Sequence, residues 1–270
     1  MKAKLLDGKK VSENILEKLV SKIAGLPKKP TLAVVLVDGD EPSEVYVARK
    51  EKAAAKIGAN FRLIKKEHRI SQAEFETLVE ELNKDRKVDG IIVQKPLPPQ
   101  IDSDEVDMLV SPEKDVDGLN SISEFIPATT RGIMELLSFY KISIVNKKVV
   151  VVGRSKLVGL PTALEFINKN AAVSICDSKT PNLGAETKQA DILIVATGKP
   201  HLIKADMVKK GAIVVDVGMN RIEKEGKNKL VGDVDFDEVS KIASYITPVP
   251  RGVGPMTVAA LLENLIDAAS

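Results

Sequence analysis

Three polar side chains between residues 43 and 50 are spaced so that one helix face would carry all of them. Ser43, Tyr46 and Lys50 lie at positions i, i+3 and i+7, and residues at this spacing share one face of an α-helix. A tyrosine beside a lysine can hold the amine in place and tune its proton affinity for acid–base chemistry. The more common interpretation of this spacing is a surface helix whose lysine reaches into solvent, and the pattern alone leaves both open.

Further polar groups follow a predicted strand and lie in a predicted turn. Gln94 ends an apolar stretch and comes directly before Lys-Pro-Leu-Pro-Pro, which would put its amide at the edge of a sheet. The segment Asp115-Val-Asp117-Gly118 places two carboxylates on a turn. One carboxylate could form the turn, and the other could bind a ligand ring that is rich in hydrogen-bond donors. Only a fold that brings these groups together would make them a site.

A glycine-containing turn after four valines is the second candidate site. The pattern from Gly153 to Gly159 is G-x-S-x-x-V-G, with Ser155 in place of the middle glycine of a dinucleotide fingerprint and Val158 before the second glycine. Glycine here would let the backbone approach a pyrophosphate, and the following helix would offer N–H groups and a favourable dipole. The alternative is an ordinary tight strand–helix turn.

The residues after the next predicted strand bear on which dinucleotide would bind. Asp177 alone would favour NAD, because a carboxylate binds the ribose 2′-hydroxyl and repels a 2′-phosphate. Arg154, Ser178 and Lys179 offer donors and positive charge to that phosphate. We therefore expect NADP, with NAD as the less favoured alternative. Two later strand ends carry glycines where ligands bind in such sheets, although ordinary turns also explain them: Ala196 to Gly198, which includes Thr197, and Asp216 to Asn220, which includes Gly218.

The elements that would position these residues alternate between apolar strands and amphipathic helices. Such alternation predicts parallel sheets with right-handed crossovers. Helices are expected from Asp7 to Ile23, from about Ser43, from a capping box at Ser71 to Glu74, from Thr129, after Val158, and from Gly254 to the end. Strands are expected at residues 31–37, 61–64, 89–94, 147–153, 171–176, 190–198, 211–218 and 245–250.

The sequence predicts an α/β protein of two domains with a cleft between them. The best boundary is the loop from Gly118 to Pro127, and the terminal helix is expected to return to the first domain. We therefore expect an N-terminal α/β catalytic domain over residues 1–122 plus 253–270, and a Rossmann dinucleotide-binding domain over residues 123–252.

Composition excludes several other classes of protein. Forty Lys and Arg nearly balance 38 Asp and Glu, and aromatic residues make up 3%, so neither a basic groove nor a base-stacking surface for nucleic acid is expected. No run approaches a membrane span or a signal peptide. Cys176 is the single cysteine, which fits a reducing, cytoplasmic compartment. His68 and His201 lie far apart, so no Cys/His metal spacing exists and we expect no metal.

Eight motifs occur together in one order along the chain: EPSEVYVARKEKA, DGIIVQKPLPP, PEKDVDG, VVVGRSKLVGLP, VATGKP, VVDVGMNR, LVGDVDF and ITPVPRGVGPMTVA. In this order, and over nearly its whole length, the chain resembles the bifunctional methylenetetrahydrofolate dehydrogenase/methenyltetrahydrofolate cyclohydrolase (FolD) family. The resemblance implies oxidation of 5,10-methylenetetrahydrofolate with NADP, then hydrolysis to 10-formyltetrahydrofolate. It also implies a homodimer formed through the cofactor domain, and a place in one-carbon metabolism and purine biosynthesis.

The resemblance also implies roles for individual residues. Lys50 would be the key polar group of the hydrolytic step, Tyr46 and Gln94 would support it, and Asp117 would bind the pterin. Further substrate contacts would come from Ser43 and from the C-terminal loop at Pro250, Gly252, Gly254 and Pro255. The cofactor contacts would be Gly153, Arg154, Ser155, Val158, Gly159, Ser178, Lys179, Thr197, Gly198, Asp216 and Gly218.

Some positions depart from the family pattern. Lys95 stands where an apolar residue is usual, Arg251 replaces a glycine, Asp177 replaces a common histidine, and the loop after Gly118 is short. Alternatives are therefore a dehydrogenase-only member that uses NAD or NADP, a non-catalytic folate- or dinucleotide-binding protein, and a relative of the amino-acid or shikimate dehydrogenases. The joint presence of Tyr46, Lys50, Gln94 and Asp117 favours the bifunctional enzyme.

Overall fold

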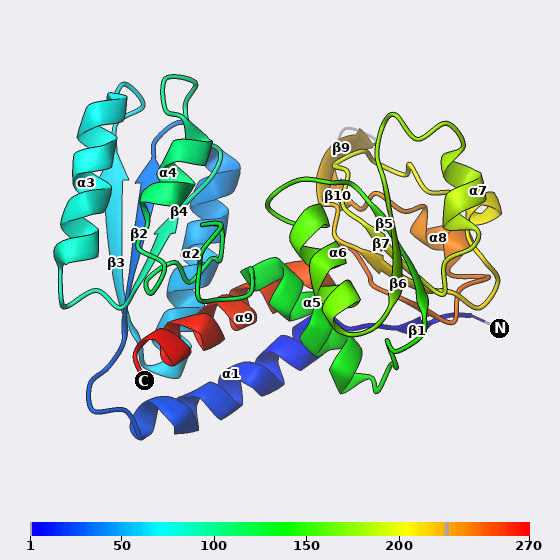
Figure 1. Cartoon of the computed structure of the whole chain (residues 1–270), viewed down its shortest axis with the longest axis horizontal. Helices are drawn as coiled ribbons and strands as arrows, with labels where there is room; N and C mark the ends of the chain where they lie inside the picture. Colours follow the sequence, from blue (N-terminus) through cyan, green and yellow to red (C-terminus); the bar gives the residue numbers. More distant parts are fainter. Residues whose placement is uncertain (1, 225–226) are drawn as a thin grey trace. The chain divides into compact units, whose positions relative to one another are not determined.

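The structure, a computed structural model, describes residues 2–224 and 227–270 (Figure 1). Contacts between residues divide the chain into two compact units, which are described separately. The folate unit, named for the substrate expected there, comprises Glu13–Ala128 and Val258–Ser270, and the nucleotide unit comprises the chain up to Ser12 and Thr129–Thr257. The terminal residues Val258–Ser270 are grouped with the folate unit. The residues up to Ser12 are grouped with the nucleotide unit, whereas we expected them in the first domain. The predicted domain boundaries themselves stay a prediction.

The folate unit is built on a three-stranded parallel sheet in the order β3-β2-β4. Its central strand, TLAVVLV, is almost entirely buried, because helices cover both faces of a parallel sheet. Alternate residues Ala33, Val35 and Val37 face a core that also contains Phe75 and Val106 from two helices. The strands are β2 (Thr31–Val37), β3 (Asn60–Lys66) and β4 (Gly90–Val93).

Local signals set the ends of the helices around this sheet. Asp40 caps the second helix, which Gly58 ends in a left-handed conformation at φ 86°. The predicted capping box of Ser71 and Glu74 is confirmed. The short helix α4 was not predicted. The helices are α1 (Gly8–Ala24), α2 (Glu41–Ile57), α3 (Gln72–Lys84), α4 (Ser103–Leu109) and α9 (Val253–Ala268), of which α1 and α9 give their first residues to the nucleotide unit.

The nucleotide unit contains a six-stranded parallel sheet in the order β1-β11-β8-β7-β5-β6. Its five predicted strands are confirmed, and β1 is an addition from the start of the chain. Lys4 pairs with Tyr245 and Leu5 with Ile246, which explains why the first residues belong to this unit. The strands are β1 (Lys4–Leu5), β5 (Lys148–Val152), β6 (Ala172–Cys176), β7 (Ile192–Val195), β8 (Ile213–Asp216) and β11 (Tyr245–Ile246).

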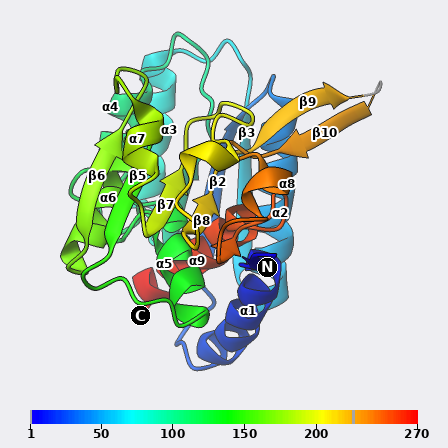
Figure 2. The same ribbon diagram turned by 90° about the vertical axis from the view of Figure 1, so that its right-hand side faces the viewer.

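Helices and one hairpin complete this unit. Figure 2 shows the antiparallel pair β9 and β10 extending away from the sheet of the same unit, a feature that we did not predict. The elements are α5 (Ala128–Phe139), α6 (Gly159–Asn168), α7 (Leu183–Thr187), the 3₁₀ helix η1 (Ala205–Met207), β9 (Asn220–Lys224), β10 (Lys227–Val231) and α8 (Phe236–Val239). In the described part of the chain, every helix is too short or too polar to cross a membrane.

The order of strands reverses beside β5, the position where open α/β sheets bind ligands. From β5 the chain goes to β6 on one side and then to β7 on the other. The turn after β5 is very tight: a Cβ on Gly153, whose φ is 111°, would lie 2.1 Å from the Ala196 carbonyl oxygen, and one on Gly159 would lie 2.1 Å from the Gly153 carbonyl oxygen. Both glycines are therefore required by packing.

Asn264→Ala should destabilise the folate unit. The Asn264 side chain is fully buried and donates to the carbonyl oxygens of Val116 at 2.8 Å and Ile126 at 3.1 Å. Leaving these acceptors unpaired should lower the free energy of unfolding by about 2–4 kcal/mol, measured by urea denaturation. Asn60→Ala, at an exposed asparagine, is the matched control. Equal unfolding midpoints for the two variants would refute this role of Asn264.

Gly159→Ala should destabilise the nucleotide unit by about 1–3 kcal/mol, because its new methyl group overlaps backbone that cannot move aside easily. Gly184→Ala is the control, since a Cβ there would meet its nearest atoms at 3.6 and 3.8 Å, which is ordinary contact. Thermal unfolding of both variants measures the difference. Similar midpoints would show that the turn after β5 has room for a side chain.

Candidate functional site

The predicted face of α2 is turned into the protein. Ser43 is 2% exposed and Lys50 is 9% exposed, while Tyr46 between them is half-buried. The interpretation of Lys50 as a solvated surface lysine is therefore wrong. A lysine amine held out of water is the first unusual feature of this unit, because removing its charge from water costs free energy.

Lys50 is hydrogen-bonded to the side-chain amide of Gln94, the group predicted at the edge of the sheet. Its Nζ donates to Gln94 Oε1 at 3.0 Å. Burial lowers the pKa of Lys50 below its ordinary value, and the negative charge of Asp117 opposes this shift. Burial raises the pKa of Tyr46, against the guanidinium of Arg49, which lies 5.7 Å from the centre of the tyrosine ring. The fold thus brings Lys50, Gln94 and Asp117 into one electrostatic group, with Tyr46 on the same helix face.

The two carboxylates of the Asp115–Gly118 turn have different surroundings. Asp115 is buried and accepts from the backbone N–H groups of Gly118 at 3.1 Å and Asn120 at 2.8 Å. Burial raises the pKa of Asp115 to about 6, against these hydrogen bonds. Asp115 is therefore the turn former, and the half-buried Asp117 is the carboxylate that interacts with Lys50.

Ser43 connects α2 to the loop after β4. Its Oγ lies 2.6 Å from Asp40 Oδ2 and 3.1 Å from the main-chain oxygen of Lys95. Asp40 also accepts from the Ser43 backbone N–H at 2.9 Å, as the N-cap of the helix. Ser43 therefore has a structural role here, and its predicted contact with the substrate stays a prediction.

In the nucleotide unit, five of the eleven predicted cofactor residues are exposed, in loops at the carboxyl ends of the strands. Arg154, Ser155, Ser178, Lys179 and Gly198 are exposed. Gly198 has φ 66°, and a Cβ added to it would meet no atom within 4 Å. Positive groups and an open glycine at the switch point suit an anionic dinucleotide.

Ser155 has a role that the fingerprint did not predict. The backbone N–H groups of Val158 and Gly159 donate to its Oγ at 3.2 and 3.4 Å, and the N–H of Leu160 donates to its main-chain oxygen at 3.1 Å. The next residue, Pro161, has no N–H. The amides of Val158 and Gly159 are therefore paired with Ser155 in this structure, and contact of this turn with a phosphate stays a prediction.

Arg154 and Asp177, which favoured different cofactors in the sequence, form an ion pair. Arg154 Nε lies 2.7 Å from Asp177 Oδ2, and the Lys179 backbone N–H donates to Asp177 Oδ1 at 2.8 Å. The N–H donors of Lys179 and Arg154 hold the pKa of Asp177 below its usual value. The carboxylate of Asp177 thus holds the guanidinium of Arg154 in place, and the positive charge of Arg154 compensates the negative charge of Asp177.

Two buried carboxylates organise the loops after β7 and β8. Asp233 Oδ2 accepts from the backbone N–H groups of Thr197 at 2.6 Å and Gly198 at 2.9 Å, and from the Thr197 hydroxyl at 2.9 Å. Asp216 Oδ1 accepts from the N–H groups of Gly218 and Asp233, both at 3.0 Å. Burial, with the charge of Asp233, raises the pKa of Asp216 to about 7.

Asp233 was not predicted as a site residue, although it lies in one of the motifs that carry the resemblance. A buried aspartate in a Gly-Asp-Val-Asp turn is the sequence signal for it. Asp216 was predicted to contact the cofactor; its carboxylate holds backbone amides instead, and contact with a dinucleotide stays a prediction.

The predicted residues of the C-terminal loop lie in the nucleotide unit. Residues 216–219 and 248–254 line one shallow pocket, so Pro250, Gly252 and Gly254 are near Asp216 and Gly218, while Pro255 follows in α9. The backbone here is closely packed, since a Cβ on Gly252 would lie 2.5 Å from the Pro248 oxygen. Arg251, a departure from the family pattern, pairs with Asp7 at 2.8 Å.

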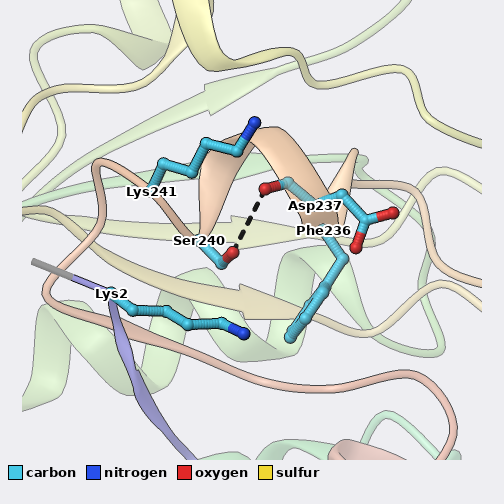
Figure 3. A pocket seen from close by; sticks show the side chains of 5 residues that line it. All are labelled: Lys2, Phe236, Asp237, Ser240 and Lys241. Carbon is cyan, nitrogen blue, oxygen red and sulfur yellow. Dashed lines mark hydrogen bonds between the residues drawn. The ribbon is translucent and has the colours of Figure 1, made fainter.

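A second pocket has a volume of about 510 Å³. It is lined by Lys2, Phe236, Asp237, Ser240 and Lys241, whose side chains Figure 3 shows. The Ser240 hydroxyl donates to the Asp237 main-chain oxygen at 3.2 Å, and Lys241 pairs with Glu238 at 2.6 Å. No predicted site residue lines this pocket. Among residues 2–224 and 227–270, no three His, Cys, Asp or Glu side chains gather as a metal site would require.

Comparisons with known proteins agree with this geometry. Residues 6–117 match the model of the tetrahydrofolate dehydrogenase/cyclohydrolase catalytic domain, and residues 127–270 match that of the NAD(P)-binding domain of the same family. The chain is 47% identical to the bifunctional protein FolD of Acholeplasma laidlawii, over 97% of this chain and 96% of that protein.

Solved structures are similar over the whole chain. The bifunctional FolD dehydrogenase/cyclohydrolase of Campylobacter jejuni matches with 45% identity and a TM-score of 0.95, covering 99% of this chain and 98% of that one. The FolD of Trypanosoma brucei, solved with NADP and an inhibitor, matches with 34% identity and a TM-score of 0.95, covering 100% and 98%. The chain therefore belongs to the tetrahydrofolate dehydrogenase/cyclohydrolase family.

Proposed function

We propose that this enzyme oxidises 5,10-methylenetetrahydrofolate with NADP and hydrolyses the resulting 5,10-methenyltetrahydrofolate to 10-formyltetrahydrofolate. The observation that carries the proposal is the buried Lys50, which is hydrogen-bonded to Gln94. The negative charge of Asp117 also acts on the pKa of Lys50. This arrangement suits acid–base chemistry on a cationic folate, in a chain that also has the nucleotide unit of the family.

In the ring-opening step Lys50 acts as the general base. Its lowered pKa provides neutral amine at a pH where a solvated lysine is charged. Water forms a bond to the methenyl carbon while its proton passes to Lys50. The bond from that carbon to N5 then breaks while the new hydroxyl group loses its proton to solvent and becomes the carbonyl of the formyl group on N10. N5 takes up the proton held by Lys50, so the net reaction releases one proton. A positively charged substrate beside the amine favours the neutral amine further.

Asp117 and Tyr46 serve the folate itself. A carboxylate accepts hydrogen bonds from the N–H groups of a pterin ring, and the half-buried tyrosine ring offers an apolar surface on the same helix face as Lys50. Since both steps use one bound folate, these residues support both. The presence of the complete group argues against a dehydrogenase-only enzyme and against a non-catalytic binding protein.

NADP fits the exposed loops of the nucleotide unit, where it would supply the acceptor for hydride. Arg154 is held by Asp177 through Nε, and a guanidinium has further N–H donors that can meet a phosphate. Ser178 and Lys179 are exposed beside it. Asp177 therefore supports NADP binding, because it holds Arg154 in place. It does not act as the NAD-favouring carboxylate that its position in the sequence suggested.

A homodimer formed through the nucleotide unit is supported by an exposed apolar surface at the edge of its sheet. Strand β6 is one of the two edge strands of this sheet, and its Ile175 is 43% exposed. Helix α6 beside it exposes Leu160, Leu164 and Ile167 at 37%, 60% and 51%. Unpaired strand edges and exposed apolar patches favour pairing with another chain. The cytoplasmic location also stays a prediction.

The first experiment is a time course with 5,10-methylenetetrahydrofolate and either NADP or NAD that follows reduced cofactor and the methenyl product separately. Reduced cofactor with little lasting methenyl product supports the bifunctional enzyme. Methenyl product that opens no faster than in an enzyme-free control would identify a dehydrogenase alone.

Lys50→Met should slow the opening of added methenyltetrahydrofolate by about 100-fold or more, because a general base typically contributes that much. Hydride transfer should fall less, since it needs no base. In the unsubstituted enzyme, ring opening should increase with pH through the lowered pKa of Lys50, since the neutral amine is the active form. Lys52→Met, at an exposed lysine of the same helix, is the control. A wild-type opening rate in Lys50→Met would refute the assignment.

Arg154→Leu should weaken NADP binding by about 10- to 100-fold, the usual contribution of a charge-assisted hydrogen bond. NAD binding should stay within about threefold, since the 2′-phosphate is the group that Arg154 is proposed to meet. Titration calorimetry with each dinucleotide measures both affinities. An equal loss for NAD and NADP would place Arg154 elsewhere on the cofactor.

Leu164→Glu should convert the dimer to a monomer, because it puts a charge into the apolar surface at β6 and α6. Sedimentation velocity measures the mass in solution. Ile122→Glu is the control, since Ile122 is 69% exposed and belongs to the folate unit. A dimer that persists in Leu164→Glu but not in Ile122→Glu would place the interface elsewhere.

A further inference from the structure

An ion pair with little exposure lies next to the proposed catalytic group in the folate unit. Lys95 Nζ is 2.5 Å from Asp107 Oδ2, and the two side chains are 20% and 13% exposed. Lys95 follows Gln94 in the loop after β4, and Asp107 lies on α4. Burial raises the pKa of Asp107, the contact with Lys95 lowers it, and the charge of Asp117 raises it. The pair therefore shares its surroundings with the proposed pterin-binding carboxylate.

The main chain of Lys95 is a junction between this ion pair and the catalytic group. Its carbonyl oxygen accepts from Gln94 Nε2 at 2.7 Å and lies 3.1 Å from Ser43 Oγ. Ser43 is in turn fixed by Asp40 at the start of α2. The Lys95 residue is therefore held at its backbone by α2 and at its side chain by α4.

This junction determines which end of the Gln94 amide faces Lys50. With Nε2 bonded to the Lys95 oxygen, Oε1 accepts from Lys50 Nζ at 3.0 Å. An amide turned by 180° would present its NH₂ group to the amine of Lys50, and a protonated lysine has only donors to offer. The position of the Lys95 carbonyl thus decides whether Lys50 has its acceptor.

We propose that the Lys95–Asp107 ion pair is a positioning element for ring opening, which fixes the Lys95 carbonyl and so directs the Gln94 amide toward Lys50. This inference rests on the proposed function of Lys50. The pair contacts neither Lys50 nor, by this assignment, the reacting atoms. Lys95 and Asp107 are therefore positioning residues, and an effect on ring opening should exceed any effect on folate binding.

The test compares ring opening with hydride transfer in variants of the full chain. Lys95→Leu removes the cation, Asp107→Asn removes the anion while keeping its shape, and Lys95→Arg keeps the pair. Lys28→Leu is the matched control, because Lys28 forms an ion pair of 2.6 Å with the buried Asp89, directly before the opposite end of the same strand β4. The decay of methenyltetrahydrofolate, corrected for opening in buffer, gives kcat and KM.

We expect Lys95→Leu and Asp107→Asn to lower the kcat of ring opening by roughly 10- to 100-fold, the effect of a small misplacement of a catalytic group. KM and hydride transfer should stay within about threefold. Lys95→Arg should restore most of the rate, and Lys28→Leu should leave it unchanged. Asp107→Asn, which preserves size, keeps the test decisive if Lys95→Leu does not fold.

Three results would overturn the proposal: a wild-type kcat in both charge-removing variants, the same loss in Lys28→Leu, or an equal fall in ring opening and hydride transfer. The last result would mean that the pair supports folate binding as a whole. Failure of the proposed function is separate, because the unsubstituted enzyme would then open methenyltetrahydrofolate no faster than buffer.

Discussion

A lysine amine that is taken out of water must either lose its proton or find hydrogen-bond acceptors and a negative charge. Both effects act on Lys50. Burial favours the neutral amine, while Gln94 and the nearby Asp117 favour the charged one. Much of the folate unit serves this balance. The cap at Asp40 fixes the start of α2, the capped turn at Asp115 places Asp117, and Asn264 fixes the main chain beside that turn.

The nucleotide unit uses the same principle with opposite charge. Asp216 and Asp233 are buried carboxylates, 3% and 0% exposed, that accept from backbone N–H groups of the loops after β7 and β8. Since an unpaired buried charge is very costly, each hydrogen bond restricts the loop that supplies it. The exposed Gly198 can then face a ligand from a loop whose shape is already set.

Sequence patterns predicted the strands and long helices well, because burial on both sides of a parallel sheet leaves a strong apolar signal. They also predicted the face shared by Ser43, Tyr46 and Lys50, since helical spacing is a local property. Whether Lys50 is buried depends on elements far away in the chain, so spacing favoured the wrong alternative there. The hydrogen bonds that Ser155 accepts, the partner of Asp177 and the loop-holding role of Asp233 were missed for the same reason: each depends on a contact that no local pattern records. The short strand β1 and the hairpin β9–β10 have little apolar periodicity and were missed as well.

The pairing of β1 with β11 also constrains when the large sheet can be completed. Lys4 is synthesised long before its partner Tyr245. The intervening strands β5 to β8 can associate earlier, but the edge of β8 stays open until β11 has emerged, and β1 has no partner strand before then. During synthesis, β1 must therefore remain available for a partner that is made after the other strands of this sheet, and contacts so distant in sequence form slowly.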